Sequence, residues 1–157
     1  EFNSRTPKIY YAEGTDGYNF TFGGISFDEN DDAIDSTTFK IADVWHQFTL
    51  VGNTLQHYHA TSQDGKTFTL YKKEDFKYVM ANEIQLEIGT RFYAFDIPSN
   101  EFKSFLSTDG YTWKMEDGTR LAFDKNNSLE SKYIKDPAVV KLADGTYIMA
   151  YVTVIPQ

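Results

Sequence analysis

Residues 136–152, DPAVVKLADGTYIMAYV, consist of two apolar runs separated by turn residues, a pattern that predicts a β-hairpin. Residues 35–51, DSTTFKIADVWHQFTLV, carry the same pattern, and the two stretches align along their whole length without a gap. In this alignment Asp136 falls on Asp35 and Met149 falls on Phe48. A chain that contains the same hairpin twice is expected to be a repeat protein.

A second element repeats between the hairpins. It is a turn that contains Asp-Gly and ends on an aromatic residue, at EGTDGYNF (13–20), SQDGKTF (62–68) and STDGYTW (107–113). The glycine supplies the positive φ that such a turn needs, and the aspartate can accept hydrogen bonds from the N–H groups of the turn. We expect the aromatic side chain to pack under the turn.

Together the two elements predict a four-stranded unit of about 46 residues, which is the size of a β-propeller blade. Strand two of each unit (FTLV, RFYAF and YIMAYV) is apolar on both faces, as a strand packed between two other blades requires. The prediction is an all-β, single domain over 1–157 with three blades. One blade is split between the termini (8–22 plus 136–154), and the others cover 35–76 and 82–117.

Three blades are too few to close a ring, because propellers typically have four to eight. We therefore expect a head-to-tail homodimer, in which strands one and two of one chain complete the blade begun by strands three and four of the other. The result is a six-bladed ring with two-fold symmetry. A trimer, a fragment of a longer parent and a monomeric sandwich are the alternatives.

The composition excludes several classes of function. A net charge of −8 argues against binding to nucleic acid or to anionic membrane surfaces, because both require clusters of Lys and Arg. Cysteine is absent, so no disulfide or thiolate chemistry is expected, and the cellular compartment cannot be predicted. No signal peptide is visible. Aromatic residues make up 17% of the chain; most are expected to pack between sheets, and a minority to line a groove for a sugar.

The Asp-Gly turns resemble the Asp-box of sialidase-like propellers, S-x-D-x-G-x-x-W, in a form one residue shorter. Residues 109–152 resemble the blade-to-blade passage of propeller glycoside hydrolases of the arabinanase/xylosidase and sialidase-like kind. The chain has about half the usual length of that family, and the arginine triad of sialidases has no counterpart. The Asp-box is structural in those enzymes, so the resemblance implies the propeller fold more strongly than it implies hydrolysis.

The resemblance also implies a catalytic set. In arabinanase-like enzymes three carboxylates, in the order Asp, Asp, Glu, start the inner strands of successive blades and act as general base, pKa modulator and general acid. The matching positions here are Asp136, Asp35 and Glu83. Hydrolysis of a glycoside needs one protonated and one ionised carboxyl group, and neighbouring carboxylates separate each other's pKa values. The structural alternative is that these residues bind backbone N–H groups at the blade junctions.

Metal binding is not the favoured reading of any motif. Residues 28–32, DENDD, offer hard oxygen ligands for calcium, but they lack the EF-hand spacing, and a solvated acidic loop is the stronger interpretation. His57 and His59 lie two residues apart on a predicted strand and should share a face, with packing as their default role. We expect His46 to pack beside the turn between strands one and two. No cofactor is predicted.

Binding residues are expected at the strand starts and at the turns between strands two and three. The candidates are Tyr78, Asn82, Arg120 and Tyr133, whose rings and polar groups suit a sugar, although packing of loops is the alternative for each. The sequence therefore predicts a carbohydrate- or small-ligand-binding propeller. A glycoside hydrolase and a protein-interaction scaffold are the two other hypotheses.

Overall fold

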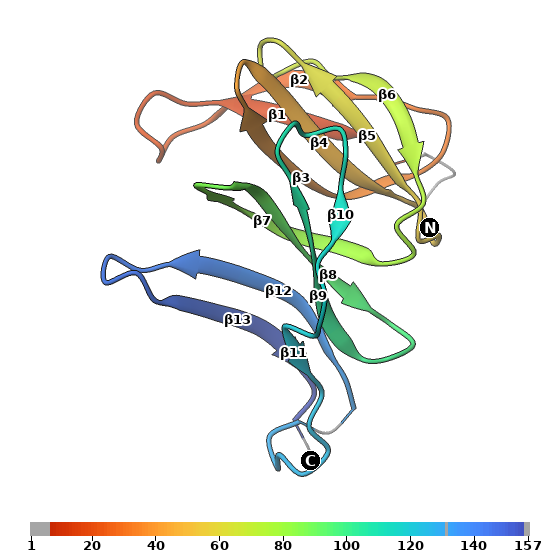
Figure 1. Cartoon of the computed structure of the whole chain (residues 1–157). Helices are drawn as coiled ribbons and strands as arrows, with labels where there is room; N and C mark the ends of the chain where they lie inside the picture. Colours follow the sequence, from red (N-terminus) through yellow and green to blue (C-terminus); the bar gives the residue numbers. More distant parts are fainter. Residues whose placement is uncertain (1–6, 131, 156–157) are drawn as a thin grey trace. The chain divides into compact units, whose positions relative to one another are not determined.

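The computed structural model describes residues 7–130 and 132–155, which form only strands and connecting turns (Figure 1). The predicted all-β class is confirmed. All paired strands run antiparallel, and the chain divides into two compact units, residues 1–76 and 77–157. Each unit contains one larger sheet and one separate hairpin.

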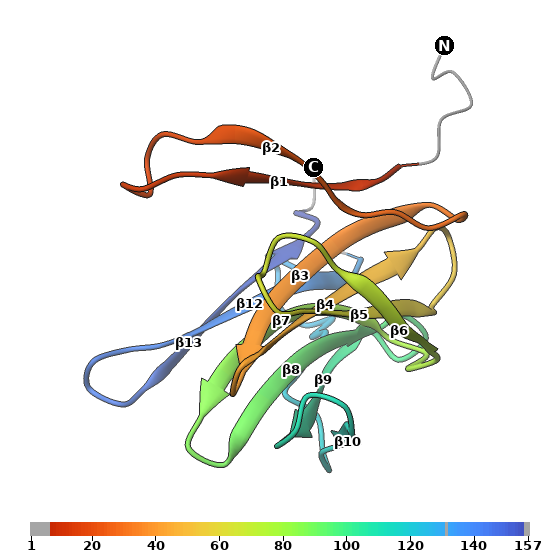
Figure 2. The same ribbon diagram turned by 90° about the horizontal axis from the view of Figure 1, so that it is seen from above.

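The first unit begins with a two-stranded ribbon, which is drawn in red and orange in Figure 2. A four-stranded sheet follows, in which the strands lie in chain order. The strands of the ribbon are β1 (Ile9–Glu13) and β2 (Thr21–Phe27), and those of the sheet are β3 (Ala33–Ile41), β4 (Val44–Val51), β5 (His57–Ser62) and β6 (Thr69–Glu74).

The second unit has the elements in the opposite order, with the larger sheet first and the hairpin last. The short strand β11 pairs with β9 beside β10. The sheet consists of β7 (Val79–Leu86), β8 (Gly89–Asp96), β9 (Glu101–Ser107), β10 (Lys114–Met115) and β11 (Leu121–Ala122), and the hairpin of β12 (Ile134–Lys141) and β13 (Tyr147–Thr153).

The two larger sheets have the same pairing register. Trp45 pairs with Ser62 in the first sheet, and Thr90 pairs with Ser107 in the second; both serines begin an Asp-Gly turn. The first strand of each sheet, and β12 as well, has a register shift near its start. Positions in one sheet can therefore be matched to positions in the other.

The register corrects the ungapped alignment of the two repeated hairpins. Lys40 pairs with Trp45, whereas its counterpart Lys141 pairs with Tyr147, so the last turn is one residue longer. Gly145 has a φ of 89°, and a glycine in this left-handed conformation allows the longer turn. After the turn the alignment shifts by one residue, and Phe48 corresponds to Ala150 rather than to Met149.

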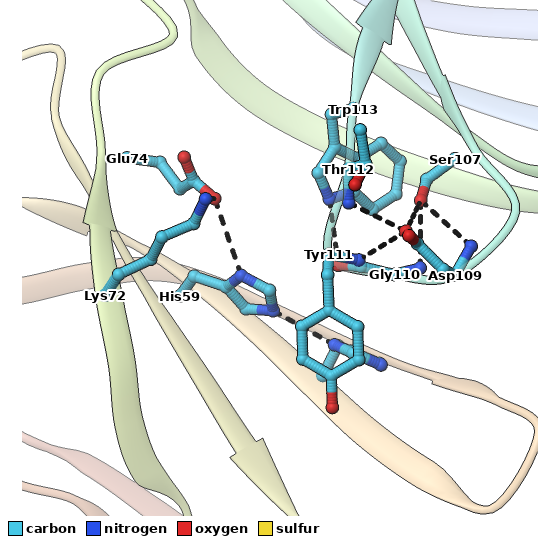
Figure 3. Close-up of polar contacts among 10 residues, drawn as sticks. His59, Lys72, Glu74, Ser107, Asp109, Gly110, Tyr111, Thr112 and Trp113 are labelled. Atoms are coloured by element: carbon cyan, nitrogen blue, oxygen red, sulfur yellow. Dashed lines mark hydrogen bonds and ion pairs between the residues drawn. The ribbon is translucent and has the colours of Figure 1, made fainter.

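The Asp-Gly turns have the internal bonding that the sequence predicts. The Asp109 carboxylate accepts hydrogen bonds from the N–H groups of Tyr111 (2.8 Å) and Thr112 (2.7 Å), as Figure 3 shows. The Ser107 hydroxyl accepts one from the N–H of Gly110 at 2.9 Å. These bonds lie within the turn that follows β9 and join residues at most three positions apart.

The bonds to the aspartate recur in the other two turns. In the Asp64 turn the donors are the N–H groups of Lys66 and Thr67, and in the Asp16 turn they are those of Tyr18 and Asn19. Backbone donors stabilise a charged carboxylate, and they lower the pKa of Asp16, Asp64 and Asp109 to about 2. In two of the turns the aromatic residue lies under the turn as expected: Phe68 is buried, and the indole of Trp113 donates to the carbonyl of Gly110 at 3.0 Å. Phe20 of the Asp16 turn is 63% exposed, so the expectation is wrong there.

Each unit has its own apolar core. In the first unit one face of the sheet packs against the β1–β2 ribbon, around Phe27, Val51, Tyr58 and Phe68. In the second unit β12 lies beside β7 (Figure 1), and the Asn82 side chain accepts a hydrogen bond from the N–H of Val139 at 2.7 Å. Packing of sheet face on sheet face is therefore the repeated structural theme.

Candidate functional site

A cavity of about 320 Å³ lies in the second unit, where the β8–β9 turn meets the segment that leads into β12. This is the kind of place that the sequence indicated, at a strand start and beside a turn between strands two and three. Its lining residues are Phe95, Ile97, Asn100, Lys132, Tyr133 and Lys135. Tyr133 is the one member of the predicted binding set that lines it.

Asn100 builds the wall of the cavity. It has a φ of 57°, a left-handed conformation that asparagine tolerates better than most residues. Its side-chain oxygen accepts a hydrogen bond from the N–H of Ile134 at 3.0 Å, and its side-chain nitrogen donates to the carbonyl of Lys132 at 3.2 Å. Asn100 thereby holds the segment that carries Tyr133 against the β8–β9 turn.

The cavity combines an apolar surface with two positive charges. Tyr133 is 38% exposed and Ile97 is 53% exposed, so both present apolar surface to solvent. Lys132 and Lys135 add ammonium groups, and the Lys135 ammonium lies 3.1 Å from a carboxylate oxygen of Asp136. This arrangement is suited to a flat ring that carries a negative charge.

The three predicted carboxylates do not occupy equivalent positions. Asp35 is the third residue of β3 and Asp136 the third residue of β12; each lies in the register shift of its strand with a φ of 51°. Glu83 lies further along β7, opposite Phe92 in the regular ladder. By pairing register, the counterpart of Asp35 in β7 is Met80, which is 3% exposed. Asp35 belongs to the first unit, and Glu83 and Asp136 to the second.

The remaining predicted binding residues have packing or bonding partners within the second unit. The Tyr78 ring meets the Phe105 ring edge-on, with their centroids 5.5 Å apart. The Asn82 side chain joins β7 to β12, as described above. The Arg120 guanidinium donates to the carbonyl of Asp117. Neither Tyr78, Asn82 nor Arg120 is among the residues that line the Tyr133 cavity.

A buried histidine cluster occupies one face of the first sheet. His57 and His59 share this face, as predicted, and each is at most 1% exposed, as is His46. His46 Nδ1 lies 3.0 Å from His59 Nε2, and His59 Nδ1 lies 3.6 Å from Glu74 Oε1 (Figure 3). Burial lowers the pKa of His57 to about 4, so this imidazole is neutral at pH 7.

The second sheet has polar side chains at matching positions. Arg91 corresponds to His46 and Ser104 to His59 in the pairing register. The Arg91 guanidinium donates two hydrogen bonds to the Glu116 carboxylate, at 2.7 and 2.8 Å, and Ser104 donates a third at 2.6 Å. Because both sheets carry a bonded polar cluster at this position, packing is a sufficient explanation for the histidines.

The acidic run at 28–32 borders a polar hollow of about 420 Å³ in the first unit. Lysine and tyrosine side chains already contact its carboxylates: Asp28 binds Lys8, and Asp31 accepts from Tyr58 (2.9 Å) and Lys73 (2.8 Å). Across the described ranges, no group of three or more His, Asp or Glu side chains is arranged to hold a metal ion. Calcium binding stays the less favoured alternative for this run, and the solvated acidic loop stays the prediction.

Sequence reasoning missed most of the cavity. Phe95 lies in β8 and Ile97 directly after it, in a stretch that reads as core, whereas Asn100 lies in a turn between strands two and three, where binding residues were expected. The available signal was the pattern Lys132-Tyr133-x-Lys135, an aromatic residue between two positive charges beside a strand start. The contact across 32 residues between Asn100 and Lys132 had no local signal.

No protein-family model matches the sequence, and no curated protein gives a significant match. Among the residues that the structure describes, no helix is long and apolar enough to span a membrane.

Proposed function

We propose that this chain binds a carbohydrate or a similar small ring-shaped ligand without transforming it. The observation that carries the proposal is the cavity in which the exposed ring of Tyr133 stands beside Ile97, Lys132 and Lys135. An aromatic ring offers a flat apolar surface on which a sugar can stack, and polar groups at the rim fix its orientation.

The lysines favour an acidic ligand over a neutral one. Two ammonium groups beside a partly apolar cavity attract a carboxylate more strongly than the same groups would in bulk water, because the local dielectric constant is lower. The Asp136 carboxylate, 3.1 Å from Lys135, balances one of these charges. A uronic acid or another carboxylated sugar is therefore the preferred class of ligand.

We further propose that each of the two larger sheets is a propeller blade and that the two hairpins are the halves of a third blade. The shared pairing register, the repeated Asp-Gly turns and the face-to-face packing within each unit support this arrangement. A second copy of the chain would complete the split blade and close a six-bladed ring. On this reading the turns are Asp-boxes of sialidase-like type.

A glycoside hydrolase that uses Asp136, Asp35 and Glu83 is the second candidate. The observation in its favour is the shared left-handed conformation of Asp35 and Asp136, because strained backbone conformations cluster at functional sites. Met80 at the third equivalent position argues against it. Release of nitrophenol from nitrophenyl glycosides, lost in Asp136→Asn, would support hydrolysis; no release across a panel of sugars would exclude this candidate's usual substrates.

The binding proposal is tested on the full chain with an array that carries neutral, uronic and sialic-acid-type glycans, followed by calorimetric titration of the best ligand. We expect acidic glycans to bind and Tyr133→Ala to weaken binding at least about fivefold, since a stacked aromatic contact contributes about 1 kcal/mol or more. Tyr18→Ala is the control, because Tyr18 is 87% exposed and outside the cavity. An empty array, or equal effects of the two substitutions, would overturn the proposal.

A further inference from the structure

The β12–β13 hairpin has one apolar face exposed to solvent. Val140, Ile148 and Val152 are 54%, 51% and 45% exposed, and alternation places the exposed residues Ala138 and Ala150 on the same face. The opposite face is partly buried in the second unit, where the Tyr151 ring meets the Phe102 ring at 5.9 Å. This hairpin is therefore covered on one side only.

The β1–β2 ribbon has the same asymmetry. Ile9 and Phe27, which are paired, face the core of the first unit. Tyr10, Phe22 and Ile25 face away from that core and are 55%, 70% and 48% exposed. Exposed apolar faces of this kind, next to strands with free edges, are typical of surfaces that pair with another chain.

We propose that β13 of one chain pairs antiparallel with β1 of a second copy, with Met149 opposite Ala12. This inference rests on the proposed assignment of the sheets as blades, and it adds the register of the joint and the two surfaces that the joint buries. By symmetry the same joint forms twice in the dimer.

The register follows from the two intact sheets. In both, the residue that begins the Asp-Gly turn pairs with a fixed position near the start of strand two: Ser62 with Trp45, and Ser107 with Thr90. In the split blade, Gly14 begins the Asp16 turn, and Tyr147 is the counterpart of Trp45. Gly14 then lies opposite Tyr147. Because the strands are antiparallel, Ala12, two residues before Gly14, lies opposite Met149, two residues after Tyr147.

The exposed faces give an independent check of this register. Opposite residues share a face, so Tyr10 lies on the side of Tyr151, and Ile9 on the side of Val152. The exposed face of β1–β2 thus extends the surface of β12–β13 that packs in the second unit. The exposed face of β12–β13 extends the surface of β1–β2 that packs in the first unit. A slip of one residue would place both buried surfaces on one side and leave the other side uncovered.

The chain contains no cysteine, so single cysteines can be introduced without competing thiols. The variants Ala12→Cys and Met149→Cys are purified separately, mixed and oxidised, and the products are separated on a non-reducing gel. We expect a disulfide-linked dimer to be the main product of the mixture and a minor product of either variant alone. The register control is Ala12→Cys mixed with Ala150→Cys, whose side chain points to the opposite face of β13.

Two outcomes would overturn the inference. Equal cross-linking in the test and control mixtures would exclude the proposed register. A monomeric double variant Ala12→Cys/Met149→Cys, closed by a disulfide within one chain, would show that the two strands meet without a second copy. If cross-linking fails while acidic glycans still bind, only the assembly is wrong; if cross-linking succeeds without glycan binding, only the ligand is wrong.

Discussion

Asp16, Asp64 and Asp109 are the residues whose role is most directly visible in the chain. Each accepts hydrogen bonds from the N–H groups two and three residues further on, so the Asp-Gly spacing alone predicts its partners. The contact of Asn82 was not predictable in this way. The partner of Asn82 is Val139, 57 residues away, and no local pattern indicates a contact between side chain and backbone over that separation.

These aspartates predict a loss of stability in acid. Their pKa values are lowered from 3.8 to about 2, so the folded state favours the ionised form. Their contribution is fully present above about pH 4 and is lost as the pH falls through about 2. We expect the urea midpoint to fall over this interval. Asp109→Asn should reduce the slope of the urea midpoint against pH. An unchanged slope would show that Asp109 does not titrate in this way.

The Arg91–Glu116 pair predicts a measurable coupling energy. Two parallel hydrogen bonds join the groups, and both side chains are only about one-fifth exposed, at 22% and 21%. A double-mutant cycle with Arg91→Ala and Glu116→Ala should give a coupling of about 1–2 kcal/mol by urea unfolding. The same cycle on the exposed pair Lys66–Glu13 should give a value close to zero. Equal couplings would contradict this prediction.

At the scale of the element, alternation of apolar residues and turn chemistry are sufficient to predict the strands. The predicted units at 35–76 and 82–117 correspond to sheets that span 33–74 and 79–122, and the short strand β11 of the second sheet was not predicted. The register shifts near the starts of β3 and β7 were not visible in the sequence; they match each other, so Met80 rather than Glu83 is the counterpart of Asp35. A shift of one residue depends on which side chains fit on the neighbouring surface, and this information is not local.

Two glycines with positive φ differ in the space around them, so substituting each by alanine distinguishes the cost of backbone strain from the cost of a steric clash. Gly89 has a φ of 135°, and a Cβ atom there would lie 2.3 Å from the Ser107 carbonyl oxygen. Gly145 has a φ of 89° with nothing within 4 Å. We expect Gly145→Ala to cost about 1 kcal/mol of stability and Gly89→Ala about 3 kcal/mol, measured by urea unfolding. Similar losses would show that β8 and β9 move apart easily.

At the scale of the whole molecule, the proposed dimer predicts that one substitution on an exposed strand changes the mass in solution. Ile148→Lys places a charge on the apolar face of β13 that the second copy should cover, and it is present twice per dimer. We expect dissociation of the dimer to become at least about tenfold more favourable, because burial of an isoleucine contributes about 1.5–3 kcal/mol. Light scattering over a dilution series measures the change.

Ile88→Lys is the matched control for this substitution. Ile88 is 60% exposed, compared with 51% for Ile148, but it lies in the β7–β8 turn rather than on the hairpin face. A variant with Ile88→Lys should keep the mass of the unmodified chain. If the unmodified chain is already a monomer at every concentration, the dimer is wrong.

The proposed division of one blade between the two hairpins has a consequence for the kinetics of folding. In the two larger sheets every strand pairs with a neighbour in chain order, apart from the short β11, which pairs with β9, so each sheet can form by local, unimolecular steps. Under the proposed assembly, the hairpins would gain their remaining partners only after two chains collide. Refolding should then end in a phase whose rate rises with protein concentration, and dilution would prolong the time during which the free strand edges are exposed to aggregation.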